Sequence, residues 1–191
     1  MNEGKTSVEA DKLFLEACRR GERSAQIRLY NLYSKAMFNT ALRILGNRQE
    51  AEEAMHDGFL AAFQKFSTYD GKAVFGTWLK RIVVNKSIDQ LRKRNRIIFE
   101  DLPSNITELS DEQDEFPDLI PLNPEQISVI MEKIHRQYQI VLSLHLFEGY
   151  SHEEIAGMLG MSYGAVRTCF SRARKALSDQ VKQYIQSIML N

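Results

Sequence analysis

Residues 162–177 place basic and hydroxyl side chains at helical spacing. In a helix, the apolar residues of this stretch fall on one face and the polar residues on the opposite face. Guanidinium, ammonium and hydroxyl groups donate hydrogen bonds to base edges and phosphates in the major groove of duplex DNA. The candidate duplex-reading residues are Ser162, Tyr163, Arg167, Thr168, Ser171, Arg172 and Lys175.

The preceding residues can hold this helix against a partner helix. Ser151 followed by Glu154 predicts a capping box at the start of a short helix, and Gly160 predicts its end. Ser162 can then cap the second helix. Two helices joined by so short a turn are typical of the helix-turn-helix, whose second helix enters the major groove. An ordinary helical hairpin with a solvated basic face is the alternative.

A second group of residues suits single-stranded nucleic acid. Aromatic residues recur through 63–78, around a loop predicted at 67–76, and residues 80–96 contain seven Lys or Arg and one Asp. Aromatic rings stack on unpaired bases, while cationic side chains follow the phosphates. Burial in the core explains Phe66 and Trp78 equally well. The candidate residues are Tyr69, Lys72, Phe75, Trp78, Lys80, Arg81, Asn85 and Arg92.

The sequence lacks the patterns of a catalytic or metal site. The four histidines share no metal-ligand spacing with one another or with Cys, Asp and Glu, so each is expected to be solvated or to cap a helix. No glycine-rich phosphate loop occurs. Cys18 and Cys169 lie far apart, which argues against a disulfide framework and fits a reducing cytoplasm. We therefore expect a cytoplasmic, non-enzymatic protein with no metal or cofactor.

Helical periodicity dominates the chain and predicts an all-α fold of two helical domains, the second ending in the helix-turn-helix. The first domain, 10–96, is expected to hold four helices, the second capped by Ser24, the third capped by Asn47 and the fourth opened by Thr77. The second domain, 124–188, is expected to hold another four. No stretch approaches the roughly 18 consecutive apolar residues of a membrane-spanning helix.

The charge changes sign between the two domains. Residues 97–123 contain eight Asp or Glu, three prolines and no Lys or Arg, which predicts an extended acidic linker. A solvated acidic loop without a binding role is the alternative. Over the whole chain Lys plus Arg equals Asp plus Glu, at 25 each, so the net charge indicates no partner.

Two stretches resemble bacterial sigma factors of the extracytoplasmic-function group, and the resemblance extends over about residues 11–185. They are FGTWLKRIVVNKSIDQLRKRNR, residues 75–96, and FEGYSHEEIAGMLGMSYGAVRTCFSRARKAL, residues 147–177. Both stretches in this order, joined by a short linker, form a highly specific pattern. A general helix-turn-helix regulator would match only the second stretch.

The resemblance implies a promoter-specificity subunit that binds core RNA polymerase and promoter DNA. In the family, the helix matching 49–66 docks on the polymerase clamp helices, and the loop matching 67–75 captures a flipped base of the non-template strand at the minus-ten element. The helix matching 78–94 helps to open that element, and the helix matching 163–177 reads the minus-thirty-five element. An anti-sigma factor would be a further partner. The implied docking residues are Glu53, His56, Asp57 and Gln64.

This sequence departs from the family at three places. His56 stands where many sigma factors have Gln, and Gly164 removes a side chain from the reading face. Residues 134–137 lack a proline often found there, so the helices on either side could run together.

A self-sufficient dimeric helix-turn-helix regulator is the main alternative function, and a nucleic-acid enzyme is a weaker one.

Overall fold

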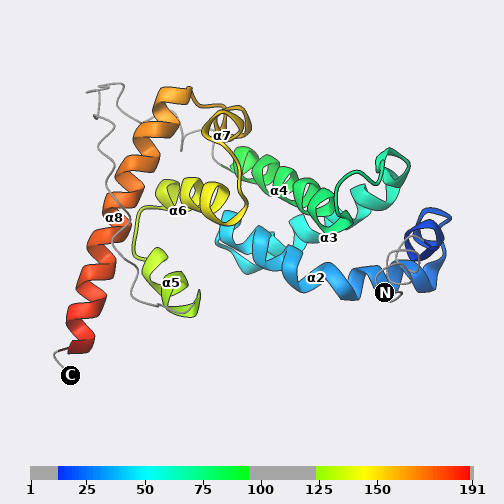
Figure 1. Ribbon diagram of the computed structural model, residues 1–191, viewed down its shortest axis with the longest axis horizontal. Coiled ribbons are helices and arrows are strands. Elements are labelled where there is room, and N and C mark those ends of the chain that lie inside the picture. The colour runs from blue at the N-terminus through cyan, green and yellow to red at the C-terminus, as the bar shows by residue number, and fades with distance from the viewer. Residues whose placement is uncertain (1–12, 95–123, 190–191) are drawn as a thin grey trace, which may run out of the picture. The chain divides into compact units, whose positions relative to one another are not determined.

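The computed structural model describes residues 13–94 and 124–189, in which the regular structure is helical throughout (Figure 1). The chain divides into two compact units between Leu91 and Arg92. The predicted all-α fold is therefore confirmed. The predicted linker, 97–123, lies outside the described residues. None of the helices in the described residues is long and apolar enough to cross a membrane.

The first unit contains a helical segment over 13–19, followed by α2 (Arg23–Leu45), α3 (Arg48–Gln64), the short 3-10 helix η1 (Phe66–Thr68) and α4 (Phe75–Arg94). The side chain of Asn47 accepts a 3.1 Å hydrogen bond from the amide of Glu50, which confirms the predicted cap of α3. Two expected helix starts are wrong. α2 begins at Arg23, so Ser24 is not its cap, and α4 begins at Phe75 because the amides of Thr77 and Trp78 already bond to the carbonyl of Val74.

The core of the first unit depends on one close approach between helices. A Cβ atom placed on Gly58 of α3 would lie 2.6 Å from a methyl carbon of Val83 in α4. The fully buried side chains of this unit include Leu29 and Ile44 of α2 and Leu79 of α4. The absence of a side chain at position 58 therefore sets how closely α3 and α4 pack.

The second unit contains α5 (Pro124–Met131), α6 (Arg136–Leu142), the π-helical turn η2 (Ser143–Phe147), α7 (His152–Leu159) and α8 (Tyr163–Met189). A turn at 132–135 separates α5 from α6, so the two helices do not run together. Ile134 in this turn is 7% exposed and packs into the cluster that joins α5, α6 and α8. Burial of Ile134 and the extended backbone of His135 (ψ 141°) hold the turn without a proline.

Candidate nucleic-acid interface

The helix-turn-helix predicted from the sequence is present. The Ser151 hydroxyl accepts from the amide of Glu154 (3.2 Å), and the Glu154 carboxylate accepts from the amide of Ser151 (2.9 Å). Gly160 ends α7 with a φ of 69°. The Ser162 hydroxyl accepts from the amide of Ala165 (3.2 Å), which starts α8. These local bonds fix the turn between the two helices.

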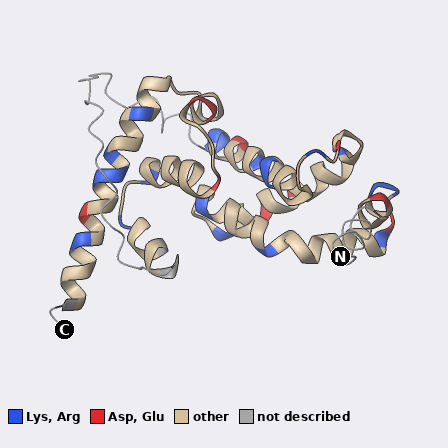
Figure 2. Ribbon diagram, in the orientation of Figure 1, with Lys and Arg blue, Asp and Glu red and all other residues tan. Residues whose placement is uncertain are grey.

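One face of α8 is buried and the other carries the predicted reading residues. Val166, Cys169 and Ala173 are fully buried, and burial raises the pKa of the Cys169 thiol to about 11, so this cysteine packs in the core. Figure 2 shows Lys and Arg recurring along α8. On the opposite face Ser162, Tyr163, Arg167, Ser171 and Lys175 are exposed, and Thr168 and Arg172 are half-buried.

Local contacts also orient Thr168 and Arg167, two of the predicted reading residues. The Thr168 hydroxyl donates to the carbonyl of Gly164 at 2.9 Å, and its oxygen keeps acceptor capacity. The guanidinium of Arg167 lies over the Tyr163 ring, 5.9 Å from its centroid. This contact orients Arg167 near the N-terminal end of α8, the part of a reading helix that contacts base edges.

His145 and His152 form a pair of rings that packs against Phe170 of α8. The rings of His145 and His152 are 4.7 Å apart between centroids, and the ring of Phe170 is 4.6 and 4.8 Å from them. The carbonyl of Tyr150 only accepts, so His145 Nδ1, at 2.8 Å, must carry the proton. Burial is the main cause that lowers the pKa of His152, and the charges of His145 and Arg167 lower this pKa further. No sequence pattern indicated this pair, because its members lie on different elements.

The aromatic residues of the first unit form one cluster. The ring of Tyr69 lies 5.4 Å from Phe75 and 5.3 Å from Trp78, and Phe66 packs against all three. Tyr69 is 8% exposed and Phe75 is 4% exposed, whereas Trp78 is half-buried. The structure therefore brings the three predicted aromatic residues together, but Tyr69 and Phe75 pack edge to face against each other and are buried from solvent.

The loop above this cluster is exposed and held by hydrogen bonds. Residues 70–74 are all exposed. The Tyr69 hydroxyl donates to the carbonyl of Ala73 at 2.6 Å. Asp70 accepts from the amide of Lys72 and pairs with its ammonium group, both at 3.1 Å, and these bonds lower the pKa of Asp70. Lys72 is therefore exposed, and its partner Asp70 was not indicated by the sequence.

α4 presents a polar stripe beside this loop. Arg81, Asn85 and Arg92 are exposed and fall at i, i+4 and i+11, which places them on one face of the helix. Lys80 is half-buried. Figure 2 shows basic residues along α4, whose opposite side is buried in the core.

The four predicted docking residues are exposed on α3. Glu53 accepts hydrogen bonds from Gln49 (3.4 Å) and from Gln90 of α4 (3.2 Å). His56 lies 3.1 Å from the Tyr30 hydroxyl, between its Nε2 and that oxygen. Leu60 lies between these residues and is 59% exposed. An exposed leucine among polar groups extends the predicted docking residues, and its place at i+4 from His56 could have indicated it. The predicted docking residues, all exposed, are Glu53, His56, Asp57 and Gln64.

A helical unit with an aromatic loop and a basic helix, followed by a helix-turn-helix unit, defines a two-domain nucleic-acid-binding protein. The Sigma-70 region 2 family model matches residues 29–97, and the Sigma-70 region 4 model matches residues 125–177. The chain belongs to the sigma-70 family, in its extracytoplasmic-function group.

Characterised relatives agree with this assignment. The chain is 29% identical to the ECF RNA polymerase sigma factor SigE of Mycolicibacterium smegmatis over 166 residues, which cover 82% of this chain and 61% of SigE. It is 27% identical to the ECF RNA polymerase sigma factor SigW of Bacillus subtilis over 177 residues, 88% of this chain and 95% of SigW.

Solved structures share the fold. CnrH, in complex with the cytosolic domain of CnrY, superposes with a TM-score of 0.50 at 23% identity, covering 91% of this chain and 98% of CnrH. RpoE of Bartonella quintana, in complex with the anti-sigma factor NepR, gives a TM-score of 0.50 at 20% identity. The match covers 81% of this chain and 95% of RpoE. At these identities the likeness concerns the fold.

Proposed function

We propose that this protein is a non-catalytic sigma subunit that binds core RNA polymerase, directs it to particular promoters and helps to open them. The observation that carries the proposal is the presence of two contact surfaces of different character on separate helical units. The α8 face suits duplex DNA, and the aromatic loop with α4 suits unpaired bases. Their order matches region 2 followed by region 4.

The upstream contact places α8 in the major groove of the minus-thirty-five element. Arg167 and Arg172 have the bidentate donor geometry that recognises guanine, and Thr168 is short enough to approach a thymine methyl group or a phosphate. Gly164 on the same face lets the backbone come close to the DNA. Exposure of Arg167 and partial exposure of Arg172 and Thr168 support this role.

The downstream contact captures an unpaired base of the minus-ten element. Because the rings of Tyr69 and Phe75 are buried, the base is received by the exposed residues 70–74 at the edge of the aromatic cluster. Trp78, half-buried at the edge of the cluster, offers the first stacking surface. Unstacking a base costs a few kcal/mol, which stacking in the cluster and docking on polymerase together offset.

Polymerase docking uses the exposed face of α3, where Glu53, His56, Asp57 and Gln64 surround Leu60. A leucine in a polar rim is the usual composition of a small protein interface. The acidic residues of 97–123 would enter a basic channel of polymerase near the RNA path. An anti-sigma factor, the partner bound to the Bartonella RpoE, would cover the docking face in the cytoplasm.

Dependence on polymerase tests the proposal against a self-sufficient dimeric regulator. A sigma subunit should bind promoter DNA weakly alone and tightly with core enzyme. A regulator should bind a palindromic duplex alone, with half-sites about one helical turn apart. Mobility shifts of genomic promoter fragments with and without core polymerase separate the two, and tight core-independent binding would contradict the proposal.

A further inference from the structure

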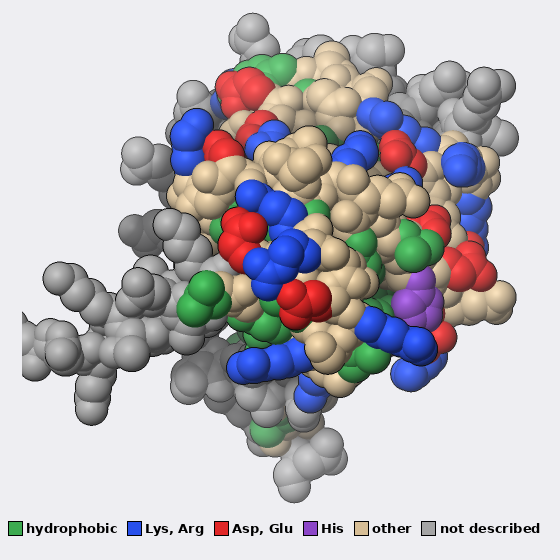
Figure 3. All heavy atoms as spheres, turned by 90° about the vertical axis from the view of Figure 1, so that its right-hand side faces the viewer, with side chains coloured by type: hydrophobic (Ala, Val, Ile, Leu, Met, Phe, Trp, Pro, Cys, Tyr) green, Lys and Arg blue, Asp and Glu red, His purple; other side chains and the backbone are tan. Residues whose placement is uncertain are grey.

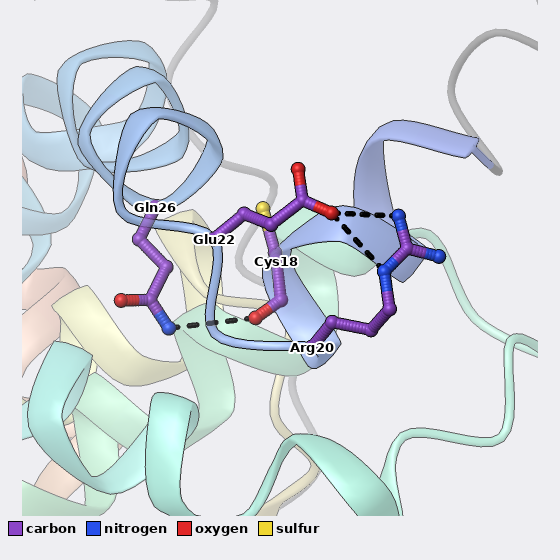
Figure 4. Close-up of polar contacts among 4 residues, drawn as sticks. All are labelled: Cys18, Arg20, Glu22 and Gln26. Atoms are coloured by element: carbon purple, nitrogen blue, oxygen red, sulfur yellow. Dashed lines mark hydrogen bonds and ion pairs between the residues drawn. The ribbon is translucent and has the colours of Figure 1, made fainter.

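The corner between the first helical segment and α2 is firmly held. Cys18 is 1% exposed, and its carbonyl accepts from the side-chain amide of Gln26 in α2 at 3.4 Å. The Arg20 guanidinium donates twice to one oxygen of Glu22, at 3.1 and 2.7 Å (Figure 4). Gly21 makes the turn itself with a φ of 81°. The end of the 13–19 helix is therefore fixed on the first unit.

From this fixed corner Arg19 reaches a residue fifty positions further along the chain. Its Nη2 donates a 3.0 Å hydrogen bond to the carbonyl of Tyr69, and its Nη1 pairs with Glu16 at 3.2 Å. Tyr69 has extended backbone (φ −75°, ψ 110°) and directly follows η1. Arg19 thus holds the point where the chain leaves regular structure and enters the exposed loop.

The loop depends on hydrogen bonds of this kind because its own side chains are not buried. Residues 70–74 are all exposed, and Val74 is 74% exposed. Figure 3, which faces the side where this loop and the 13–19 corner lie, shows acidic and basic side chains interspersed. Without apolar burial, a few hydrogen bonds decide the loop conformation. Two of them act on Tyr69: Arg19 binds its carbonyl, and its hydroxyl binds Ala73.

We propose that Arg19 is a positioning residue for base capture, which holds the Tyr69 carbonyl so that residues 70–74 are preorganised to receive the unpaired base. This inference rests on the base-capture role proposed above. It gives a part in promoter opening to a helix that precedes the region 2 match, which begins at residue 29. Preorganisation raises affinity because less loop entropy is lost on binding.

The test compares holoenzymes that carry Arg19→Met, Arg19→Lys or the matched control Arg23→Met, which removes an exposed cation at the start of α2. Each is titrated with a single-stranded non-template minus-ten oligonucleotide. We expect Arg19→Met to weaken binding about three- to ten-fold, the effect of one hydrogen bond, and Arg23→Met to weaken it less than two-fold. Arg19→Lys should resemble Arg19→Met, because the shorter ammonium lacks the planar donor geometry.

Two further outcomes would overturn the inference. Arg19, whose side chain is 41% exposed, would instead be a phosphate contact if Arg19→Lys restores binding. Arg19 would also be a phosphate contact if the loss of affinity in the double variant, Arg19→Met with Tyr69→Phe, equals the product of the two single losses. Positioning predicts that the double variant loses less than the product, since both changes free the same loop.

A separate readout distinguishes failure of this inference from failure of base capture. Amide hydrogen exchange in residues 69–74 should be faster in Arg19→Met and unchanged in Arg23→Met. An abasic scan of the oligonucleotide tests capture itself. If no abasic position weakens wild-type binding, base capture fails, whatever the exchange shows. If capture holds but Arg19→Met changes neither exchange nor affinity, only the role of Arg19 fails.

Discussion

The hydroxyl of Tyr69 donates a 2.6 Å hydrogen bond to the carbonyl of Ala73, four residues further along the loop. The ring is 8% exposed and packs against Phe75 and Trp78, and burial raises the pKa of the phenol. Tyr69 therefore joins the aromatic cluster to the loop above it. Removing the whole side chain would open a cavity, so the hydroxyl is the informative group to remove.

Tyr69→Phe should slow open-complex formation by about two- to ten-fold, because one hydrogen bond that shapes the loop is lost. Polymerase binding should not change, since the docking face on α3 is untouched. Stopped-flow measurement on duplex and premelted promoters checks this, with Tyr184→Phe in the second unit as the control. A defect of equal size on both templates assigns the effect to base capture and not to melting; no defect on either would contradict the role of the loop.

Arg172→Ala should weaken reading of the upstream element by about 1–3 kcal/mol, because a bidentate contact to a base is lost. Mobility shifts of holoenzyme on matched and substituted minus-thirty-five elements measure this. Lys182→Ala is the control, since Lys182 is exposed on the same helix beyond the reading segment. An equal loss on every DNA sequence would make Arg172 a phosphate contact instead.

The second unit should lose stability as the pH falls. The pKa of His152 lies below its ordinary value of 6.5 in the folded protein, chiefly through burial and then through His145 and Arg167, while Glu153 acts in the opposite direction. Above the ordinary value the ring is neutral in both states. As the pH falls from 6.5 toward the lowered folded pKa, the unfolded state binds the proton first, so unfolding becomes easier.

Chemical unfolding of the full chain at pH values from about 7.5 to about 5.5 checks this expectation around the ordinary histidine pKa. His152→Gln should flatten the pH dependence of the second unit, whereas His135→Gln, at an exposed position, should not. A His152 ring-proton titration with a midpoint at or above 6.5 would contradict the account.

Replacing two helical glycines with alanine should change the stability of the two units in opposite directions. Gly58→Ala should destabilise the first unit by about 1–3 kcal/mol, because its Cβ would lie 2.6 Å from the stiff side chain of Val83. Gly157→Ala in α7 meets no atom within 4 Å and should stabilise the second unit by up to about 1 kcal/mol. Thermal unfolding of both variants measures the pair. A stable Gly58→Ala protein would contradict the close packing of α3 against α4 at Gly58 and Val83.

Features that depend on neighbouring residues were predictable from the sequence. The capping box of Ser151 with Glu154, the end of α7 at Gly160 and the cap of α3 by Asn47 follow from local bonds alone, and all three are present. The reading face of α8 follows from helical periodicity. The Ser24 cap was wrong because α2 already starts at Arg23, after Glu22, whose side chain makes no capping hydrogen bond. A capping residue near a helix start therefore does not by itself fix the first residue of the helix.

Relationships between distant residues were not predictable. Nothing in the sequence links Arg19 with the carbonyl of Tyr69, or the ring of His145 with that of His152. The burial of Tyr69 also escaped prediction, because a tyrosine in a polar loop is exposed unless a tertiary partner covers it. These contacts arise from how helices pack, which a periodic pattern does not specify.

Run-off transcription tests the central claim most directly. Core RNA polymerase is supplied with this protein, or without it, on linear promoter fragments chosen by mapping transcription starts after its induced expression. The account predicts discrete run-off products only when the protein is present, and their loss with Arg172→Ala on promoters that depend on the upstream element. Absence of any promoter-dependent product on all of these fragments would contradict it.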